Sequence, residues 1–290
     1  MAPIVLFVYN RIEHLKKTIN ALQKNIHANE SDLIIFSDGA KNAEDLNKIQ
    51  EIRNYLKSIS GFYKIKIIER DNNLGLAKSI ITGLNDTFLS YDKIIILEDD
   101  IITDKYFLTF MNEALLKYRD VSNIYSVTGF MYPIESNERK SIFLPLTSSW
   151  GWGTWKEKWC IFDYQMTGKE NIQNNIILKN KFNLADEDFA GMLNFGNNSW
   201  AIRWYYSVFI RNGLGVFPTQ SLITNTGFDN SGTNCNNNNS KYSSILKNKP
   251  IDLATNIVID LNYYSKIINH LTYVPPPLYK RIFKKLLIWK

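Results

Sequence analysis

Three adjacent carboxylates, Glu98, Asp99 and Asp100, follow the apolar run 93–97 (KIIIL). Because like charges repel one another, a site that keeps three acids together usually offers them a cation. Hard divalent ions such as Mg²⁺ and Mn²⁺ take oxygen ligands, often one or two carboxylates together with substrate phosphate oxygens. A diphosphate leaving group needs such an ion because negative charge grows on it as the bond breaks. The triplet therefore predicts a metal and phosphate site, and a solvated turn before the next helix is the alternative.

Residues 150–155 read Trp-Gly-Trp-Gly-Thr-Trp, and Trp159 follows. Glycines beside the rings allow the backbone to approach a ligand closely, and a flat indole suits the C–H face of a sugar ring. We expect residues 150–153 to line such a site, with a core corner of packed tryptophans as the alternative. Trp155 and Trp159 are four residues apart, a spacing that favours packing along a helix.

The elements that must position these residues follow from apolar patterning. Apolar runs predict buried strands at 3–9 and 33–37, and further strands are expected at 64–69 (KIKIIE) and 93–97. Helical spacing or composition predicts helices at 11–25, 43–58, 73–89 and 104–118. This alternation predicts right-handed βαβ units and a parallel, doubly wound sheet. Since ligands bind beyond the carboxyl ends of such strands, the acidic triplet, Asn10-Arg11 and Asp38-Gly39 are expected at one edge.

The pattern changes after residue 120. Short strands are expected at 124–128, 141–146, 215–218 and 221–225, and helices near 153–160, 169–180 and 199–212. Because no linker rich in Pro, Gly or Ser separates the halves, we expect a single domain over 1–274 followed by a tail, 275–290. Within it, residues 1–120 form a nucleotide-binding half and residues 121–274 a second half.

The composition of the 290 residues is that of an ordinary globular chain, with a net charge of +6 and a pI of about 9.0. No nucleic-acid motif and no basic stripe with aromatic interleaving is present, so we expect no nucleic-acid partner. Two cysteines make neither a disulfide framework nor a metal quartet. No signal peptide and no apolar run of membrane-spanning length is evident, so we expect a cytoplasmic protein.

The order apolar strand, Asn-Arg, strand-Asp-Gly, Asn-Leu-Gly, strand-Glu-Asp-Asp resembles the GT-A glycosyltransferases over roughly residues 1–235. The layout is most similar to bacterial transferases of surface-polysaccharide synthesis and to N-acetylglucosaminyltransferase I. The resemblance implies an α/β fold with a Rossmann-like, mostly parallel sheet flanked by helices and an acceptor-side α+β half. It also implies a nucleotide-sugar donor, a UDP-sugar first of all, an Mn²⁺ or Mg²⁺ ion, and a glycan or lipid-linked glycan acceptor.

The same resemblance assigns roles to individual residues. Asp100 corresponds to the metal ligand, and Asp99 is expected near the ribose or the sugar. The donor-binding positions that it implies are Tyr9, Asn10, Arg11, Asp38, Lys78, Glu98, Asp99, Trp150 and Gly151. The acceptor-binding positions are Trp152, Trp200 and Arg203.

An inverting transfer needs a general base within hydrogen-bond reach of the acceptor hydroxyl. In the bacterial enzymes that the chain resembles, a Trp-Asp-x-x-Trp pattern supplies it; here the pattern reads Trp200-Ala201-Ile202-Arg203-Trp204, and alanine cannot accept a proton. Three explanations stay open: an inactivating substitution, a natural loss of activity, or another acid as base. The other candidate acids are Asp186, Glu187, Asp188 and Asp229.

Two further segments carry expectations. Residues 227–232 lead into an Asn-rich stretch, 230–239, that fits a lid over the donor diphosphate, with a plain surface loop as the alternative. Relatives often have His near position 234, where this chain has Asn234. The tail 278–290 (LYKRIFKKLLIWK) reads as a basic amphipathic helix that contacts the inner face of the cell membrane, or else docks on its own core.

Other functions remain as alternatives. A nucleotidyltransferase would need a Gly-rich basic phosphate loop after the first strand, and residues 9–13 (YNRIE) are not one. A non-catalytic nucleotide-sugar or glycan-binding protein is kept open by Ala201. A retaining glycosyltransferase is also open because fold does not fix stereochemistry.

Overall fold

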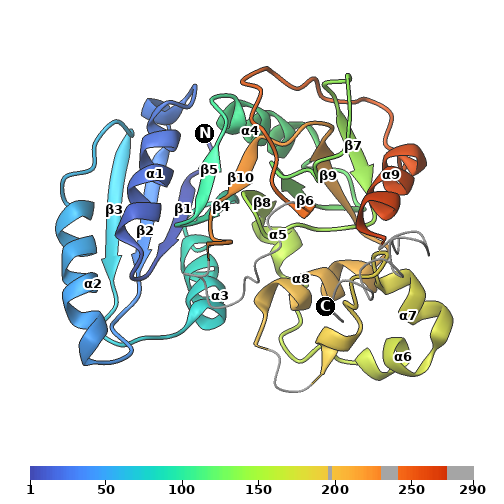
Figure 1. Cartoon of the computed structure of the whole chain (residues 1–290), viewed down its shortest axis with the longest axis horizontal. Coiled ribbons are helices and arrows are strands. Elements are labelled where there is room, and N and C mark those ends of the chain that lie inside the picture. Colours follow the sequence, from blue (N-terminus) through green and yellow to red (C-terminus); the bar gives the residue numbers. More distant parts are fainter. Residues whose placement is uncertain (195–197, 230–240, 273–290) are drawn as a thin grey trace, which may run out of the picture.

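The computed structural model describes residues 1–194, 198–229 and 241–272 (Figure 1). The strands are β1 (Ile4–Val8), β2 (Asp32–Ser37), β3 (Lys64–Glu69), β4 (Lys93–Glu98), β5 (Ile101–Thr103), β6 (Ile124–Thr128), β7 (Ser141–Leu144), β8 (Trp152–Trp155), β9 (Leu214–Pro218) and β10 (Ile223–Asn225). The helices are α1 (Ile12–Gln23), α2 (Ala43–Leu56), α3 (Leu76–Thr87), α4 (Phe107–Lys117), α5 (Lys156–Trp159), α6 (Lys169–Asn174), α7 (Ile176–Phe182), α8 (Trp200–Phe209) and α9 (Leu261–Leu271). Single 3₁₀ turns lie at η1 (Ala28–Glu30) and η2 (Gly191–Leu193). The expectations for Asn234, the 230–239 lid and the 275–290 tail fall on residues outside these ranges.

A single large sheet organises the described chain, in the order β3-β2-β1-β4-β8-β6-β9-β7. The first four strands are parallel, with Ile4 of β1 opposite Leu33 of β2 and Ile95 of β4. The α/β class with a mostly parallel sheet flanked by helices is therefore confirmed. Because these strands run in one direction, Val8, Ser37 and Glu98 end at the same edge of the sheet.

Both faces of the parallel part are covered at its centre, which explains why β1 is apolar at every position, whereas the edge strand β3 keeps exposed charged residues. Leu6 and Val8 of β1 pack in the cluster that contains the buried residues of α1 and α4. Val5 and Phe7 pack on the opposite face with residues of α3 and α8. Figure 1 shows α3 and α8 below the sheet, with α6 and α7 beyond α8 at the lower right.

The tryptophan segment differs from the expectation of a helix near 153–160. Residues 152–155 form strand β8, which pairs antiparallel with both β4 and β6, and only Lys156–Trp159 is helical. A Cβ on Gly153 would lie 2.7 Å from the carbonyl oxygen of Ile94, so a glycine here permits close strand pairing. The long-range partners on β4 and β6, rather than local spacing, decide the conformation.

A second, two-stranded sheet joins distant parts of the chain. β5 pairs antiparallel with β10, with Ile101 opposite Asn225. This pairing carries the residues after β10 to the turn that holds Asp99 and Asp100. The sequence patterns predict neither β5 nor α9.

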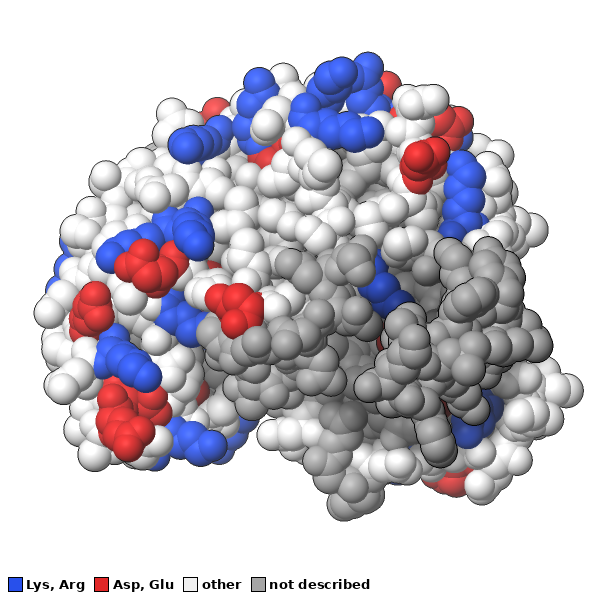
Figure 2. All heavy atoms as spheres, in the orientation of Figure 1, with Lys and Arg blue, Asp and Glu red and all other residues white. Residues whose placement is uncertain are grey.

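Figure 2 shows basic and acidic side chains interspersed on one face of the molecule, most clearly over its left part. The net positive charge therefore does not by itself identify a polyanionic partner. Within the described ranges, no helix combines the length and apolarity needed to cross a bilayer.

Candidate functional site

The acidic triplet lies at the carboxyl end of β4. Asp99 and Asp100 are only 3% and 6% exposed, in the turn between β4 and β5. One guanidinium nitrogen of Arg11, Nη2, lies 2.8 Å from Oδ2 of Asp100 and also contacts Oδ1 of Asp99. An arginine three residues beyond the end of β1 is thus the counter-ion of the acidic pair.

Burial makes negative charge costly in this turn. It raises the pKa of Asp99 to about 6, against the opposing attraction of Arg11. Burial, followed by repulsion from Asp100 and Asp99, raises the pKa of Glu98 to about 8. Burial lowers the pKa of Arg11, but the two carboxylates outweigh it and leave that pKa raised. The site therefore favours an added positive charge.

The segment after β10 closes one side of the acidic turn. The backbone N–H and the hydroxyl of Thr226 donate to the carbonyl oxygen of Asp100, at 2.9 and 3.0 Å. A Cβ on Gly227 would lie 2.2 Å from Oδ2 of Asp100, so only glycine leaves room beside this carboxylate. Nε2 of the buried His14 lies 3.2 Å from Oδ2 of Asp229 and 3.2 Å from the carbonyl oxygen of Thr226. These contacts hold Asp229 close to the acidic turn.

The residues present fit a hard divalent ion held by few protein ligands. Within the ranges that the structure describes, no group of three His, Cys, Asp or Glu side chains is arranged as a ligand set. An ion held by one or two carboxylates and completed by substrate phosphates and water needs no such group. Asp99 and Asp100 are two buried carboxylates at the end of one strand, which is the kind of donor set that such an ion uses.

Tyr9 and Asn10 are fixed by an acid that the sequence patterns do not single out. The hydroxyl of Tyr9 donates to Oδ2 of Asp45 at 2.7 Å, and the amide of Asn10 donates to Oδ1 at 2.9 Å. Burial, then the hydrogen bond with Asp45, raises the pKa of Tyr9 to about 12. Asp45 lies in the first turn of α2, and the side chain of Asn42 caps that helix by accepting from the Asp45 N–H. An acid in a capped first turn is ordinary, which is why its role is not evident from sequence.

Asp38, directly after β2, holds the loop between β3 and α3 by hydrogen bonds to its carboxylate. Its carboxylate accepts from the backbone N–H of Leu74 at 3.0 and 3.1 Å and of Gly75 at 3.1 Å. The amide of Asn73 donates to the carbonyl oxygen of Gly39 at 2.9 Å. Since an ionised carboxylate has about four acceptor positions, Asp38 can hold this loop and still accept from a ligand. Lys78, in the first turn of α3, is exposed.

Trp150 lies in an aromatic cluster that includes Phe228, the residue that follows Gly227. Its ring makes edge contacts with Phe130, Phe228 and Tyr242, at centroid distances of 4.8 to 5.6 Å. Gly151 has φ of +56°, a left-handed conformation that favours glycine. The hydroxyl of Tyr242 donates to Oε1 of Glu187 at 2.8 Å, so this acid reaches the cluster through Tyr242.

Two of the expected acceptor-binding rings are core residues instead. Trp152 is 0% exposed and stacks on Trp200, itself 3% exposed, at a centroid distance of 5.3 Å. Trp159 and Trp204 complete this indole cluster. A ring without exposed surface offers no face to an acceptor in this conformation, and packing explains its position; acceptor contact by Trp152 stays a prediction. Trp200 is nearly as buried and serves the same packing.

The remaining predicted residues make their contacts away from the acidic turn. Arg203 is 8% exposed and donates to the carbonyl oxygens of Tyr164 and Ser199 at 3.0 and 2.7 Å, which uses its charge inside the fold. Ala201 lies in the first turn of α8 and packs against the cluster between α3 and α8. Oδ1 of Asp188 accepts from the N–H of Gly191 at 3.1 Å, so this acid organises its own loop.

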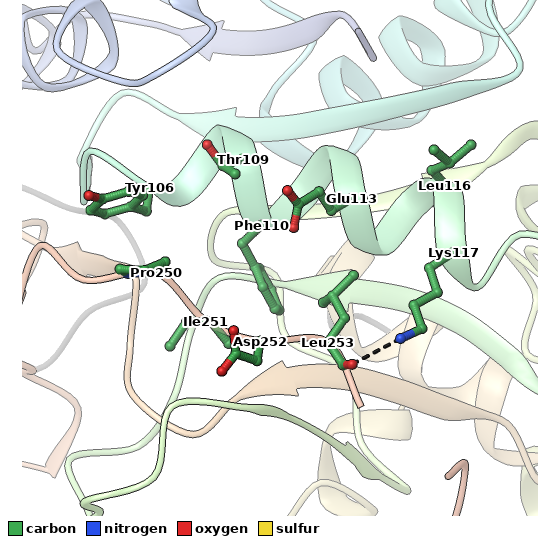
Figure 3. A pocket seen from close by; sticks show the side chains of 10 residues that line it. All are labelled: Tyr106, Thr109, Phe110, Glu113, Leu116, Lys117, Pro250, Ile251, Asp252 and Leu253. Carbon is green, nitrogen blue, oxygen red and sulfur yellow. Dashed lines mark hydrogen bonds between the residues drawn. The ribbon is translucent and has the colours of Figure 1, made fainter. Parts of the chain in front are cut away.

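A cavity of about 450 Å³ lies elsewhere, between α4 and residues 250–253 (Figure 3). Phe110, Leu116 and Ile251 contribute apolar surface, and Nζ of Lys117 donates to the carbonyl oxygen of Leu253 at 2.9 Å. It contains none of the predicted site residues. The candidate chemistry therefore lies at the acidic turn and not at this cavity.

Comparison with known proteins identifies a family. The family model described as "Glycosyl transferase family 2" matches residues 4–178. No curated protein matches the chain.

Similar solved structures include S. aureus TarS 1-349, with 12% sequence identity and a TM-score of 0.46 over 77% of this chain and 60% of that one. Mannosyltransferase PcManGT from Pyrobaculum calidifontis, in complex with GDP-Man and Mn²⁺, has 9% identity and a TM-score of 0.37 over 66% of this chain and 52% of its own. Glucosyl-3-phosphoglycerate synthase from Mycobacterium tuberculosis has 17% identity and a TM-score of 0.30 over 44% and 43%. The chain thus spans 60% of the length of the TarS fragment. Likenesses this distant carry no argument about substrate or mechanism.

Proposed function

Because the chain belongs to glycosyl transferase family 2, and is a glycosyltransferase by that membership, we propose that it moves a sugar from a nucleotide-sugar, a UDP-sugar first of all, to a hydroxyl of a glycan or lipid-linked glycan. The observation that carries this proposal is the buried acidic pair at the carboxyl end of β4, with Arg11 bound to it and Gly227 packed closely against Asp100. Ligands of doubly wound sheets bind at this edge.

The donor would lie along the carboxyl ends of β1, β2 and β4. Tyr9 and Asn10, held by Asp45, and Asp38, held at the β3–α3 loop, would face the nucleoside. Asp100 would hold Mn²⁺ or Mg²⁺, which neutralises the charge that grows on the departing diphosphate. The half-buried Trp150 would offer its ring to the sugar.

The base is proposed to be Asp229. Ala201 cannot accept a proton, and Asp188 is engaged with its own loop. Asp229 is held by His14 next to the segment that contacts Asp100, and its side chain is 51% exposed. A carboxylate in that position can take the proton of an acceptor hydroxyl as it attacks the anomeric carbon from the face opposite the diphosphate, which inverts the configuration.

Calorimetric titration with a panel of nucleotide-sugars, with and without Mn²⁺, tests the donor site. We expect one donor to bind in a metal-dependent manner, and Asp100→Asn to remove that dependence. Absence of binding to any donor with metal present would refute the proposal and favour a glycan-binding or degenerate protein.

Three substitutions separate the candidates for the base. If Asp229 is the base, Asp229→Asn lowers turnover by about 10² to 10⁴, whereas Asp188→Asn does not. If position 201 is the base position, Ala201→Asp raises turnover by a similar factor. Proton NMR of the product's anomeric configuration would decide between an inverting and a retaining transfer.

Membrane contact through residues 278–290 belongs to the same proposal, because a lipid-linked acceptor would lie at the inner face of the membrane. Each basic residue near an anionic surface adds about 1 kcal/mol of attraction. The full chain should pellet with anionic vesicles, and a chain that ends at Val274 should not. Equal pelleting would contradict this role of the tail.

A further inference from the structure

Arg11 occupies the place where a cation on the acidic pair would be needed. Its guanidinium contacts Oδ2 of Asp100 at 2.8 Å and Oδ1 of Asp99. The side chains of Asp99, Asp100 and Arg11 are 5%, 9% and 19% exposed, so this interaction is largely shielded from water. A planar, delocalised guanidinium is well suited to bridging two carboxylates in such a place.

A divalent ion that binds Asp100 must compete with this guanidinium. Both require Oδ2 of the same carboxylate, and the two cations would repel each other at contact distance in a poorly hydrated site. Gly227 limits the approach from the other side, since even a Cβ there would overlap Oδ2. A free metal ion therefore meets an acidic pair whose negative charge is already partly compensated by Arg11.

A nucleoside diphosphate changes this competition. Its oxygens give the ion further ligands, and they give the guanidinium a new anionic partner as it leaves Asp100. Arg11 begins α1 at its N-cap, shortly after β1, and so lies at the sheet edge where a diphosphate would bind. Metal and diphosphate together can therefore displace Arg11 from Asp100, which neither of them does well alone.

We propose that Arg11 is a displaceable counter-ion that keeps the metal off Asp100 until a nucleoside diphosphate binds. Metal uptake and donor binding are then coupled through Arg11, each raising the affinity for the other by the same factor. This inference rests on the proposed function and adds to it the way in which the metal site is regulated.

The test is the affinity for Mn²⁺ alone, measured by electron paramagnetic resonance and calorimetry on the full chain, with UDP as the second probe. Arg11→Gln removes the competing charge and should bind Mn²⁺ alone about tenfold more tightly than the unmodified chain. The advantage that UDP gives to Mn²⁺ binding should shrink by the same factor. Lys17→Gln is the matched control, because it removes one positive charge from an exposed position of the same helix and should leave the Mn²⁺ affinity within about twofold.

Thermal unfolding gives a second readout. Arg11→Gln leaves two buried carboxylates without a counter-ion, so its melting temperature should fall, and Mn²⁺ alone should raise it by more than in the unmodified chain. If Arg11→Gln does not fold, Arg11→Lys keeps the charge but removes the guanidinium whose Nη2 contacts both carboxylates. Its affinity for Mn²⁺ alone should then exceed that of the unmodified chain.

Two results would overturn the inference. One is an Mn²⁺ affinity that is unchanged in the Arg11 variants. The other is UDP binding that is equally strong without metal and is lost in Arg11→Gln. Arg11 would then replace the metal at the diphosphate and would not compete with it. Absence of UDP binding with Mn²⁺ present would instead overturn the proposed function, and the comparison with Mn²⁺ alone would still decide whether Arg11 competes with the ion.

Discussion

Asp38→Ala should destabilise the protein even without a ligand. Asp38 is 5% exposed, and its carboxylate accepts the backbone N–H groups of Leu74 and Gly75 at 3.0 to 3.1 Å. Hydrogen bonds to a charged acceptor contribute about 1.5 to 3 kcal/mol each. Because Leu74 and Gly75 are half-buried, water can replace part of the hydrogen bonding that their N–H groups lose in the variant. We therefore expect a loss of about 3 kcal/mol in the free energy of unfolding.

Urea unfolding, followed by circular dichroism, measures this change. Asp71→Ala is the control, because Asp71 is exposed in the same connection and its removal should alter stability by about 0.5 kcal/mol or less. Asp38→Asn keeps one acceptor oxygen and should lose less than Asp38→Ala. If Asp38→Ala matched the control, the carboxylate would not be holding the β3–α3 loop, and its role would be limited to a ligand.

Three more predictions concern the packing and the site. Trp152→Ala should lower the free energy of unfolding by about 3 to 5 kcal/mol, because it removes a fully buried ring; an acceptor Michaelis constant that changes without loss of stability would contradict this. Asp45→Ala should weaken donor binding in calorimetry because it releases Tyr9 and Asn10, and donor affinity equal to that of the unmodified chain would count against the role given to Asp45. Chelation of divalent metal should abolish transfer yet leave the melting temperature nearly unchanged, because Arg11 already pairs with both carboxylates of the acidic pair; cooperative unfolding on chelation would argue that the metal is structural.

The parallel half of the fold could be predicted from the sequence because its signals are local. Strand and helical segments alternate four times, and a strand buried on both faces, such as β1, is apolar at every position. The chain direction shared by these strands then brings Arg11, Asp38 and the acidic triplet to one edge. Each of these residues closely follows its strand, so no long-range information was needed to place it there.

Other features could not be predicted from sequence patterns, because they depend on contacts between residues far apart in the chain. Residues 152–155 are a strand because β4 and β6 flank them, and Trp152 is buried because α5 and α8 supply the indoles on which it packs. The pairing of Asp45 with Tyr9 and of Asp229 with His14 leaves no periodic signal in the sequence. The bond between Arg11 and Asp100 spans 89 positions. Sequence patterns fix which residues reach the sheet edge, whereas only packing in three dimensions fixes which charges meet there, because side-chain pairing is a property of distance in space and not of spacing along the chain.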